Sequence, residues 1–439
     1  MSRSRAVRWD ICEEHLDEAA FLWDRWERAL NAPNYAIGEV AIGPEERLLA
    51  HLDGLVLGGQ PAVADKLLLP ALGDDDTGKV TAATWALLQA EDADHLDAIV
   101  EALAKARDKI RTALGRALGL CHRGDLHARL LPLLGKSSPA IQATILRALA
   151  SRPLPPGMPD LPLWAFLSSS DRELQMAALN VVRRGRRPGL LAQVEALLGS
   201  QDAAVRDTAI ETGLVLGLPA VWPACRRVAA ARGPSCRLPL ALLALGGAPA
   251  DLQLVTAALG VTELVSDALW ALGFSGQIQA AEAALALVGD SKHGALAAES
   301  LGTIAGLRIE GPFAKPPTTD NAPPSATEDE TTPPEPKPED DLPLPNAERV
   351  QTWWAKARAQ FQPGVRYLFG RPVTAETYAP ALAAAPTWRR RLLCLESAAR
   401  SPVDVDTSAW TAQQSAQQIP PLRFDHTLVM LTRPSGRAT

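Results

Sequence analysis

The feature of this sequence that most constrains its fold is a pattern that recurs at intervals of about thirty residues between Val80 and Leu307. Each copy begins with an apolar anchor residue, and small or apolar residues follow four and five positions later. That spacing places the three side chains on one face of a helix. The anchors are Val80, Ile110, Ile141, Leu174, Val205, Leu238, Leu264 and Leu296.

Each anchor is expected to lie in the second of two helices. Residues that can accept a hydrogen bond from free helix N–H groups stand three positions before five of the anchors, which predicts N-caps at Thr77, Ser138, Asp171, Asp202 and Ser235. A further apolar segment precedes each anchor helix, as residues 190–200 precede 201–217. A lone helix pair cannot bury its apolar face, so repeated pairs must stack on their neighbours. We therefore predict an all-α fold in which residues 76–311 form an α-solenoid.

The segments on either side do not follow the repeat. Residues 1–75 read as amphipathic helices, as expected of a cap on the exposed end of a solenoid. Residues 312–345 hold 11 of the 36 prolines and eight acidic residues against two lysines. This composition predicts a disordered acidic linker. Residues 346–439 are expected to form a C-terminal helical unit with a loose tail.

Composition bounds the classes of function. The net charge is −6, and removing the linker's eight acids and two lysines leaves equal numbers of acidic and basic residues. A strongly basic nucleic-acid binder is therefore not expected. We find neither a secretory signal nor an apolar run long enough to span a membrane. The five cysteines are few and widely spaced, which favours thiols in a reducing cytoplasm over a disulfide framework.

The repeats have a recognisable form. Residues 191–209 fit the pattern L-x5-LL-x3-D-x2-VR-x2-A, which resembles the short bacterial HEAT-like repeat. In that family the helix that carries the Val-Arg pair lines the concave side. The resemblance implies that Arg206 and its equivalents Arg111, Gln142 and Gln175 face inward, where they could contact a partner. Ordinary solvated positions beside a core residue are the alternative.

Two adjacent tryptophans add a second candidate surface. Trp353 and Trp354 lie in a predicted helix, and neighbouring helical side chains point about 100° apart. Both cannot face one core, so one of them is expected to pack on the solenoid end or on a partner. Trp85 and Trp270 fall at core positions of the repeat.

Blocks at both ends of the chain give a more specific resemblance. Residues 22–30, 45–59, 364–373 and 389–402 resemble a bacterial HEAT-like repeat family that is often encoded beside type VI secretion toxins. The resemblance implies a protein-binding scaffold, most simply an immunity protein that sterically neutralises a cognate toxin, with no catalytic residue, metal or cofactor. An adaptor of the secretion apparatus is one alternative, and self-association of the chain stays open.

A search for chemical motifs supports this expectation. Cys121, His122 and His127 lack the spacing of a zinc site, and no phosphate-binding or dinucleotide-binding glycine motif occurs. A nucleic-acid-binding or DNA glycosylase-like HEAT enzyme is the other alternative, because residues 183–237 hold nine arginines against four acids. Those arginines are expected on opposite edges of the solenoid, where they would not form the continuous stripe that phosphates need.

Overall fold

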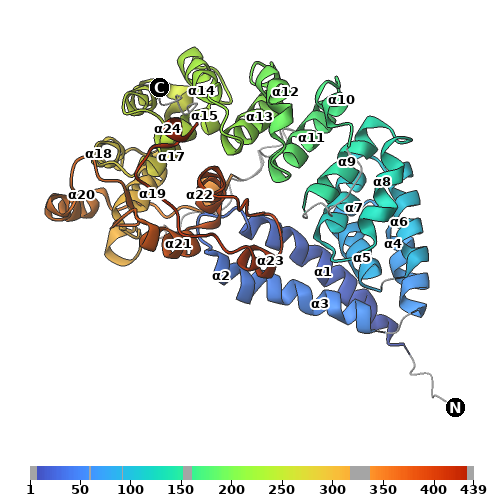
Figure 1. Cartoon of the computed structure of the whole chain (residues 1–439). Helices are drawn as coiled ribbons and strands as arrows, with labels where there is room; N and C mark the ends of the chain where they lie inside the picture. Colours follow the sequence, from blue (N-terminus) through green and yellow to red (C-terminus); the bar gives the residue numbers. More distant parts are fainter. Residues whose placement is uncertain (1–6, 59–60, 91, 152–160, 317–336, 433–439) are drawn as a thin grey trace, which may run out of the picture. The chain divides into compact units, whose positions relative to one another are not determined.

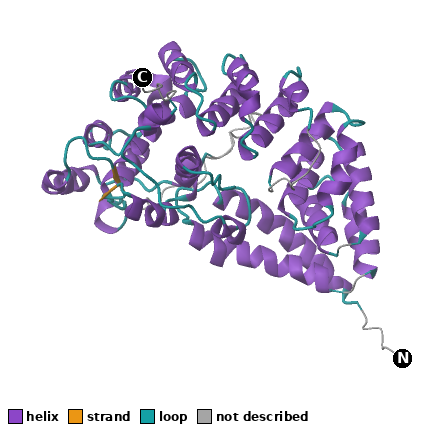
Figure 2. Cartoon of the chain, in the orientation of Figure 1, coloured by secondary structure: helices purple, strands orange, loops and turns teal. Residues whose placement is uncertain are grey.

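The computed structural model describes residues 7–58, 61–90, 92–151, 161–316 and 337–432. Within these ranges the chain is almost entirely helical, and its strands are β1 (Tyr367–Leu368) and β2 (Arg371–Pro372), which form a small antiparallel hairpin (Figures 1 and 2). The predicted all-α class is confirmed.

The chain divides into two compact units, and both are discontinuous in sequence. The N-terminal unit comprises residues 1–31, 35–221 and 397–418. The C-terminal unit comprises residues 32–34, 222–396 and 419–439. These units cut across the four segments expected from the sequence, because part of the predicted C-terminal segment belongs to each of them.

In the N-terminal unit, each helix of an alternating series packs against the helix two positions further along the chain. Its helices are α1 (Trp9–Ala29), α2 (Ile37–Val40), α3 (Glu46–Leu57), α4 (Leu69–Ala71), α5 (Thr77–Gln89), α6 (Ala93–Lys105), α7 (Asp108–Leu120), α8 (Leu126–Leu134), α9 (Pro139–Ala150), α10 (Leu163–Leu167), α11 (Arg172–Arg184), α12 (Leu191–Leu197), α13 (Ala203–Val215) and α23 (Thr411–Ala416), with η1 (Ala41–Glu45) and η2 (Ala64–Leu68) as short π-helical turns. We call α5, α7, α9, α11 and α13 the anchor helices, and each packs against the next. The intervening helices α6, α8, α10 and α12 each contact the anchor helix that follows, and α1 lies against α3 and α5 (Figure 1).

Burial of the anchor residues follows the predicted helical face in most repeats. Val80, Leu174, Val205, Leu264 and Leu296 are buried. Ile110, Ile141 and Leu238 are half-buried instead. In α9 the fully buried side chains begin at Ala143, two positions after the anchor, so the core face of this helix is rotated slightly from the predicted one.

The helix caps confirm two of the predicted N-cap residues and correct others. The Asp202 carboxylate accepts hydrogen bonds from the N–H groups of Ala204 (2.9 Å) and Val205 (3.1 Å), and the Asp171 carboxylate caps α11 by accepting from the Leu174 N–H (2.9 Å). The prediction for Thr77 is wrong, because Asp76 caps α5 and Thr77 is the first helical residue. A carboxylate there also interacts favourably with the positive end of the helix dipole.

The other two predicted caps make no such bond. Ser138 occupies the N-cap position of α9, but no side-chain cap hydrogen bond forms there. Ser235 lies one residue too early, because Cys236 holds the N-cap position of α15. The backbone of Ser235 has φ +64°, in the left-handed region. The chain therefore turns sharply before α15 begins.

The C-terminal unit repeats the packing of alternate helices over a shorter run. Its helices are α14 (Val221–Ala231), α15 (Arg237–Gly246), α16 (Asp251–Ala257), α17 (Val265–Ser275), α18 (Ile278–Leu285), α19 (Gly294–Ala305), α20 (Ala347–Ala357), α21 (Ala375–Ala384), α22 (Thr387–Arg400) and α24 (Leu428–Leu431), with α14 and α22 each containing a boundary between the units. Helix α15 packs on α17, and α17 packs on α19. The β-hairpin lies against the ends of these helices, where Tyr367 N–H donates to the Gly276 carbonyl (2.8 Å) and Phe369 N–H donates to the Thr303 carbonyl (2.7 Å).

A buried arginine organises the interior of this unit. The Arg389 side chain is completely buried, and its Nε donates to Glu299 Oε1 at 3.0 Å. Its guanidinium carbon lies 4.6 Å from the ring centroid of Phe274 and 5.4 Å from that of Trp270. Gly273 leaves room for this group, because a Cβ there would lie 2.8 Å from the guanidinium nitrogens. The charge is thus both paired and enclosed by aromatic rings, as a buried cation requires.

The predicted acidic linker, residues 312–345, is described only at its two flanks, and residues 317–336 lie outside the described residues. The flanks pair with each other: Lys315 N–H donates to the Leu344 carbonyl (2.8 Å), and Asn346 N–H donates to the Phe313 carbonyl (2.7 Å). The second flank also contacts α15 through an ion pair between Glu339 and Arg237.

Among the described residues, no single helix is long and apolar enough to cross a membrane. Segments 251–260 and 262–275 are long and apolar enough only when they are taken together, and they are bent at 117° to each other.

Candidate functional site

A segment from near the end of the sequence lies against the anchor helices of the N-terminal unit. We call residues 403–416 the strap. Its Trp410 is buried, and the indole ring centroid lies 4.4 Å from that of Trp26, 5.8 Å from Trp23 and 6.0 Å from Trp85. The Trp410 Nε1–H donates to the carbonyl of Leu120 in α7 (3.3 Å). The strap is therefore part of the core of this unit.

A buried carboxylate fixes the strap beyond the tryptophan. Glu45 is only 3% exposed, and its Oε2 accepts a hydrogen bond from Trp26 Nε1 (2.8 Å). Both Glu45 oxygens accept from the Thr411 N–H at 3.0 Å, and Oε1 also accepts from its hydroxyl at 2.5 Å. This carboxylate satisfies free donors at the start of α23, as a capping side chain does.

Arginines from α7 and α11 hold the first half of the strap. Arg184 Nη1 donates to the Asp404 carbonyl (3.0 Å), and Arg184 Nη2 pairs with Asp406 Oδ2 (3.0 Å). Arg183 Nε lies 3.1 Å from Asp404 Oδ2, and Arg116 Nη2 donates to the backbone carbonyl of Ser408 (2.6 Å). The helices thus present guanidinium groups to carboxylates and carbonyls of an extended chain.

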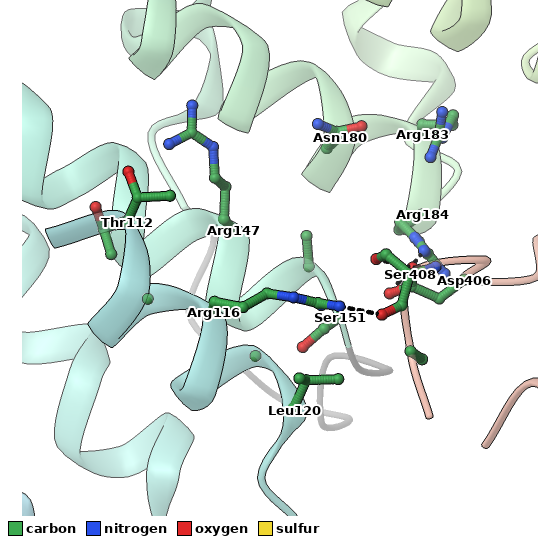
Figure 3. Close-up of a pocket in the computed structure, with 15 residues that line it drawn as sticks. Thr112, Arg116, Leu120, Arg147, Ser151, Asn180, Arg183, Arg184, Asp406 and Ser408 are labelled. Atoms are coloured by element: carbon green, nitrogen blue, oxygen red, sulfur yellow. Dashed lines mark hydrogen bonds and ion pairs between the residues drawn. The ribbon is translucent and has the colours of Figure 1, made fainter. Parts of the chain in front are cut away.

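Between these helices and the strap lies a pocket of about 290 Å³, shown in Figure 3. Its charged and polar walls come from three consecutive anchor helices, α7, α9 and α11, and from the strap. Those wall residues are Thr112, Arg116, Thr144, Arg147, Ser151, Asn180, Arg183, Arg184, Asp406 and Ser408. Among the described residues, four arginines and one carboxylate line the space, which suits a polar ligand with negative charge.

The carboxylate in the pocket wall is held in its charged form. Burial by itself would raise the pKa of Asp406, but Arg184 and hydrogen bonds from Ser408 outweigh burial and leave that pKa lowered. Asp406 Oδ1 accepts from the Ser408 hydroxyl (2.6 Å) and N–H (3.1 Å). Both oxygens of this carboxylate are thereby engaged on the strap side of the pocket.

The four predicted partner-binding positions of the repeats occupy equivalent sites on α7, α9, α11 and α13, but their polar groups are used within the fold. Gln142 donates to the Leu134 carbonyl (2.6 Å) and Gln175 to the Leu167 carbonyl (3.2 Å), each at the last residue of the preceding helix.

The two arginines of the set are likewise engaged. Arg111 donates to the Ala106 carbonyl (2.6 Å) at the end of α6 and pairs with Asp108 (2.7 Å). Arg206 pairs with Asp207 (3.0 Å). Gln142, Gln175 and Arg111 therefore tie the two helices of a pair together, and none of the four positions belongs to the pocket wall.

The tryptophan pair lies in α20 of the C-terminal unit. Trp354 is buried and stacks on Phe361, with ring centroids 5.4 Å apart. Trp353 is half-buried beside it. Of the predicted core tryptophans, Trp85 is buried and Trp270 is half-buried.

Within the described ranges, no group of three or more Cys, His, Asp or Glu side chains could hold a metal ion. Cys121 is buried, and the adjacent His122 hydrogen-bonds with Gln413 of the strap (2.6 Å). A separate histidine pair joins α1 to α3, where the Nδ1 atoms of His15 and His51 lie 3.1 Å apart.

Sequence reasoning did not identify the strap or the pocket. Residues 406–419 were expected to form a helix of the C-terminal unit, but no motif indicated where they dock, and the strap's partners lie up to 366 positions away along the chain, as for Thr411 and Glu45. One signal was the tryptophan at position 410, which lies outside the repeat. Of the wall arginines, Arg183 and Arg184 belong to the arginine-rich stretch 183–237, whereas nothing in the sequence singled out Arg116 or Arg147.

No protein-family model matches the chain, and no curated protein matches it. Among solved structures, human deoxyhypusine hydroxylase in complex with glycerol is similar, with 16% sequence identity over 65% of this chain and 95% of that chain and a TM-score of 0.21. A likeness at that TM-score carries no argument about this protein. The fold itself defines an all-α protein of consecutive packed helices.

Proposed function

We propose that the chain is an α-solenoid of HEAT-like helix pairs with helical caps at both ends. The support is the packing order: α5 contacts α7, α7 contacts α9, and so on to α13, and each later anchor helix keeps one companion helix. The same alternation recurs from α15 to α19 in the C-terminal unit. Nearest-neighbour stacking of this kind is the defining property of solenoid repeats.

We further propose that the protein is a protein-binding scaffold, most simply an immunity protein that covers and neutralises a cognate type VI secretion toxin. The observation that supports the binding role is the polar pocket on three consecutive anchor helices. Because the stacked helices hold this surface in place, a partner can bind it without any refolding of the chain. The choice of a toxin as the partner rests on the family resemblance of the sequence blocks at the two ends of the chain. Neutralisation by coverage is steric and requires no catalytic group in this chain.

The pairing of the arginines favours a protein partner over a nucleic acid. A phosphate-binding stripe needs cations that face the solvent. In the stretch from 183 to 237, arginines from both units are paired with carboxylates of their own unit. These pairs are Arg183 with Glu211, Arg184 with Asp406, Arg206 with Asp207, Arg226 with Asp251 and Arg237 with Glu339.

The cytoplasm is the compartment we propose. The five cysteines are all buried and carry free thiols. A reducing compartment preserves such thiols.

Co-expression tests this function. The chain is expressed in a host together with the toxin encoded by the neighbouring gene, and growth is measured along with co-purification of the two proteins. We expect restored growth and a stable complex, whereas an unrelated toxin serves as the control for specificity. Size-exclusion chromatography with light scattering reports any self-association in the same samples. Growth arrest that persists with no complex would refute the proposal.

A further inference from the structure

We propose that the pocket on α7, α9 and α11 binds a carboxylate group, held by Arg147 with Asn180. This inference goes beyond the proposed function, because it names the chemistry of a ligand and holds whichever protein is the partner. The carboxylate belongs either to an acidic side chain of a protein or to a small free acid.

The first support is the distribution of charge around the pocket. In the part of the wall that the structure describes, Arg116, Arg147, Arg183 and Arg184 accompany one acidic residue, Asp406. The other carboxylates that pair with these arginines are Glu27, Glu173, Glu211 and Asp404, and none of them belongs to the wall. A ligand inside the pocket therefore meets the guanidinium groups before it meets their counter-charges.

The second support is the supply of hydrogen-bond donors. The hydroxyls of Thr112, Thr144 and Ser151 each donate to a carbonyl of their own helix, at 2.8 to 3.0 Å, and so keep only acceptor capacity toward the pocket. The side-chain donors that remain among the described wall residues are the Asn180 amide and guanidinium N–H groups. A carboxylate is acceptor-only and matches them, and the arginine fork suits its planar geometry.

The third support singles out Arg147 among the four arginines. Arg183 and Arg184 are at most 17% exposed and are held by the strap. Arg147 is 39% exposed, and it pairs through one nitrogen with Glu173, which is 40% exposed. Ion pairs this open to water are weak, so a ligand can share or take over the guanidinium. Arg116 is engaged on the strap side of the pocket, where its Nη2 donates to the Ser408 carbonyl and its Nε donates to Glu27.

Asp406 sets where in the pocket the ligand sits. Its charge would repel a second carboxylate, but both of its oxygens are engaged by Arg184 and Ser408 on the strap side. Figure 3 shows Arg147 rising from α9 and Asp406 on the opposite, strap side of the pocket. The carboxylate therefore lies at the end near Arg147 and Asn180. The single acid in the wall also disfavours a doubly charged phosphate relative to a carboxylate.

Calorimetric titration of the full-length protein tests this site with four probes. They are glutarate, the peptide acetyl-Ala-Glu-Ala-amide, its neutral twin acetyl-Ala-Gln-Ala-amide, and inorganic phosphate. The variants are Arg147→Gln and Asn180→Ala, with Arg129→Gln as matched control. Arg129 in α8 is 40% exposed and likewise pairs with one carboxylate, that of Asp97, but it is not in the pocket wall.

We expect saturable binding of at least one carboxylate probe, weakened about tenfold or more by Arg147→Gln and clearly by Asn180→Ala, but unchanged by Arg129→Gln. Binding of the glutamate peptide and not of its glutamine twin identifies a protein side chain as the source. Binding of glutarate alone identifies a small acid. The inference is overturned if neither carboxylate binds, if phosphate binds more tightly than both, or if the Arg147 and Arg129 variants behave alike. No toxin enters these titrations, so their failure is distinct from failure of the proposed function.

Discussion

Replacing Trp410 by alanine should destabilise the N-terminal unit strongly, although this residue stands far outside the repeat. The indole is 5% exposed and is surrounded by Trp23, Trp26 and Trp85. Truncating a buried tryptophan removes its transfer free energy and leaves a cavity, which together cost about 3–5 kcal/mol. The same substitution removes the hydrogen bond to the Leu120 carbonyl, and that loss is included in the range given.

The assay is urea denaturation followed by far-UV circular dichroism, with hydrogen exchange of residues 403–416 measured in parallel. We expect a lower unfolding midpoint and faster exchange across the strap. Trp164→Ala is the matched control, because that side chain is 63% exposed in α10 and its removal should change the free energy of unfolding by no more than about 0.5 kcal/mol. If both variants lose equally little stability, the strap is not part of the core and the reasoning from ring contacts fails.

Three further predictions concern single contacts. Asp202→Ala removes the cap of α13 and should lower the free energy of unfolding by about 1 kcal/mol, measured by urea titration. Gly273→Ala forces the enclosed Arg389 guanidinium to move and should cost about 1–3 kcal/mol in the same titration, whereas a neutral result would show that this space is not filled. Burial first, and then a neighbouring histidine, lower the pKa of His51, so stability present above about pH 6.5 should be lost as the pH falls toward the lowered folded-state pKa. Melting temperatures of His51→Gln across that window should fall less steeply than those of the parent protein.

Local features of the fold were predictable because their causes are local. The cap at Asp202 depends on residues two and three positions away, and the burial of Val205 depends on the helical period. The wrong N-cap prediction at Thr77 is also local. Asp76 is the residue that caps α5, and counting three positions back from Val80 gives Thr77 instead.

The candidate site could not be predicted in this way. Gln142 and Gln175 were expected to face a partner because their register is inward, yet the same register brings them within reach of the last carbonyl of the preceding helix. Whether such a side chain faces a partner or bonds to the preceding helix depends on its length and on the offset between the two helices. The repeat period of the sequence shows neither. The pocket needs the strap as its fourth wall, and no local pattern indicates where an aperiodic segment will dock.

The discontinuity of the N-terminal unit sets an order of events during synthesis. Residues up to 221 leave the ribosome long before residues 397–418 exist, and at about 5–20 residues per second the delay is roughly 10 to 40 seconds. Through that interval Trp23, Trp26 and Trp85 lack the indole that covers them, and Arg184 lacks its carboxylate. A nascent chain without residues 403–416 therefore lacks the contact that covers these three tryptophans in the folded unit. Early termination would leave these side chains open to chaperones and proteases.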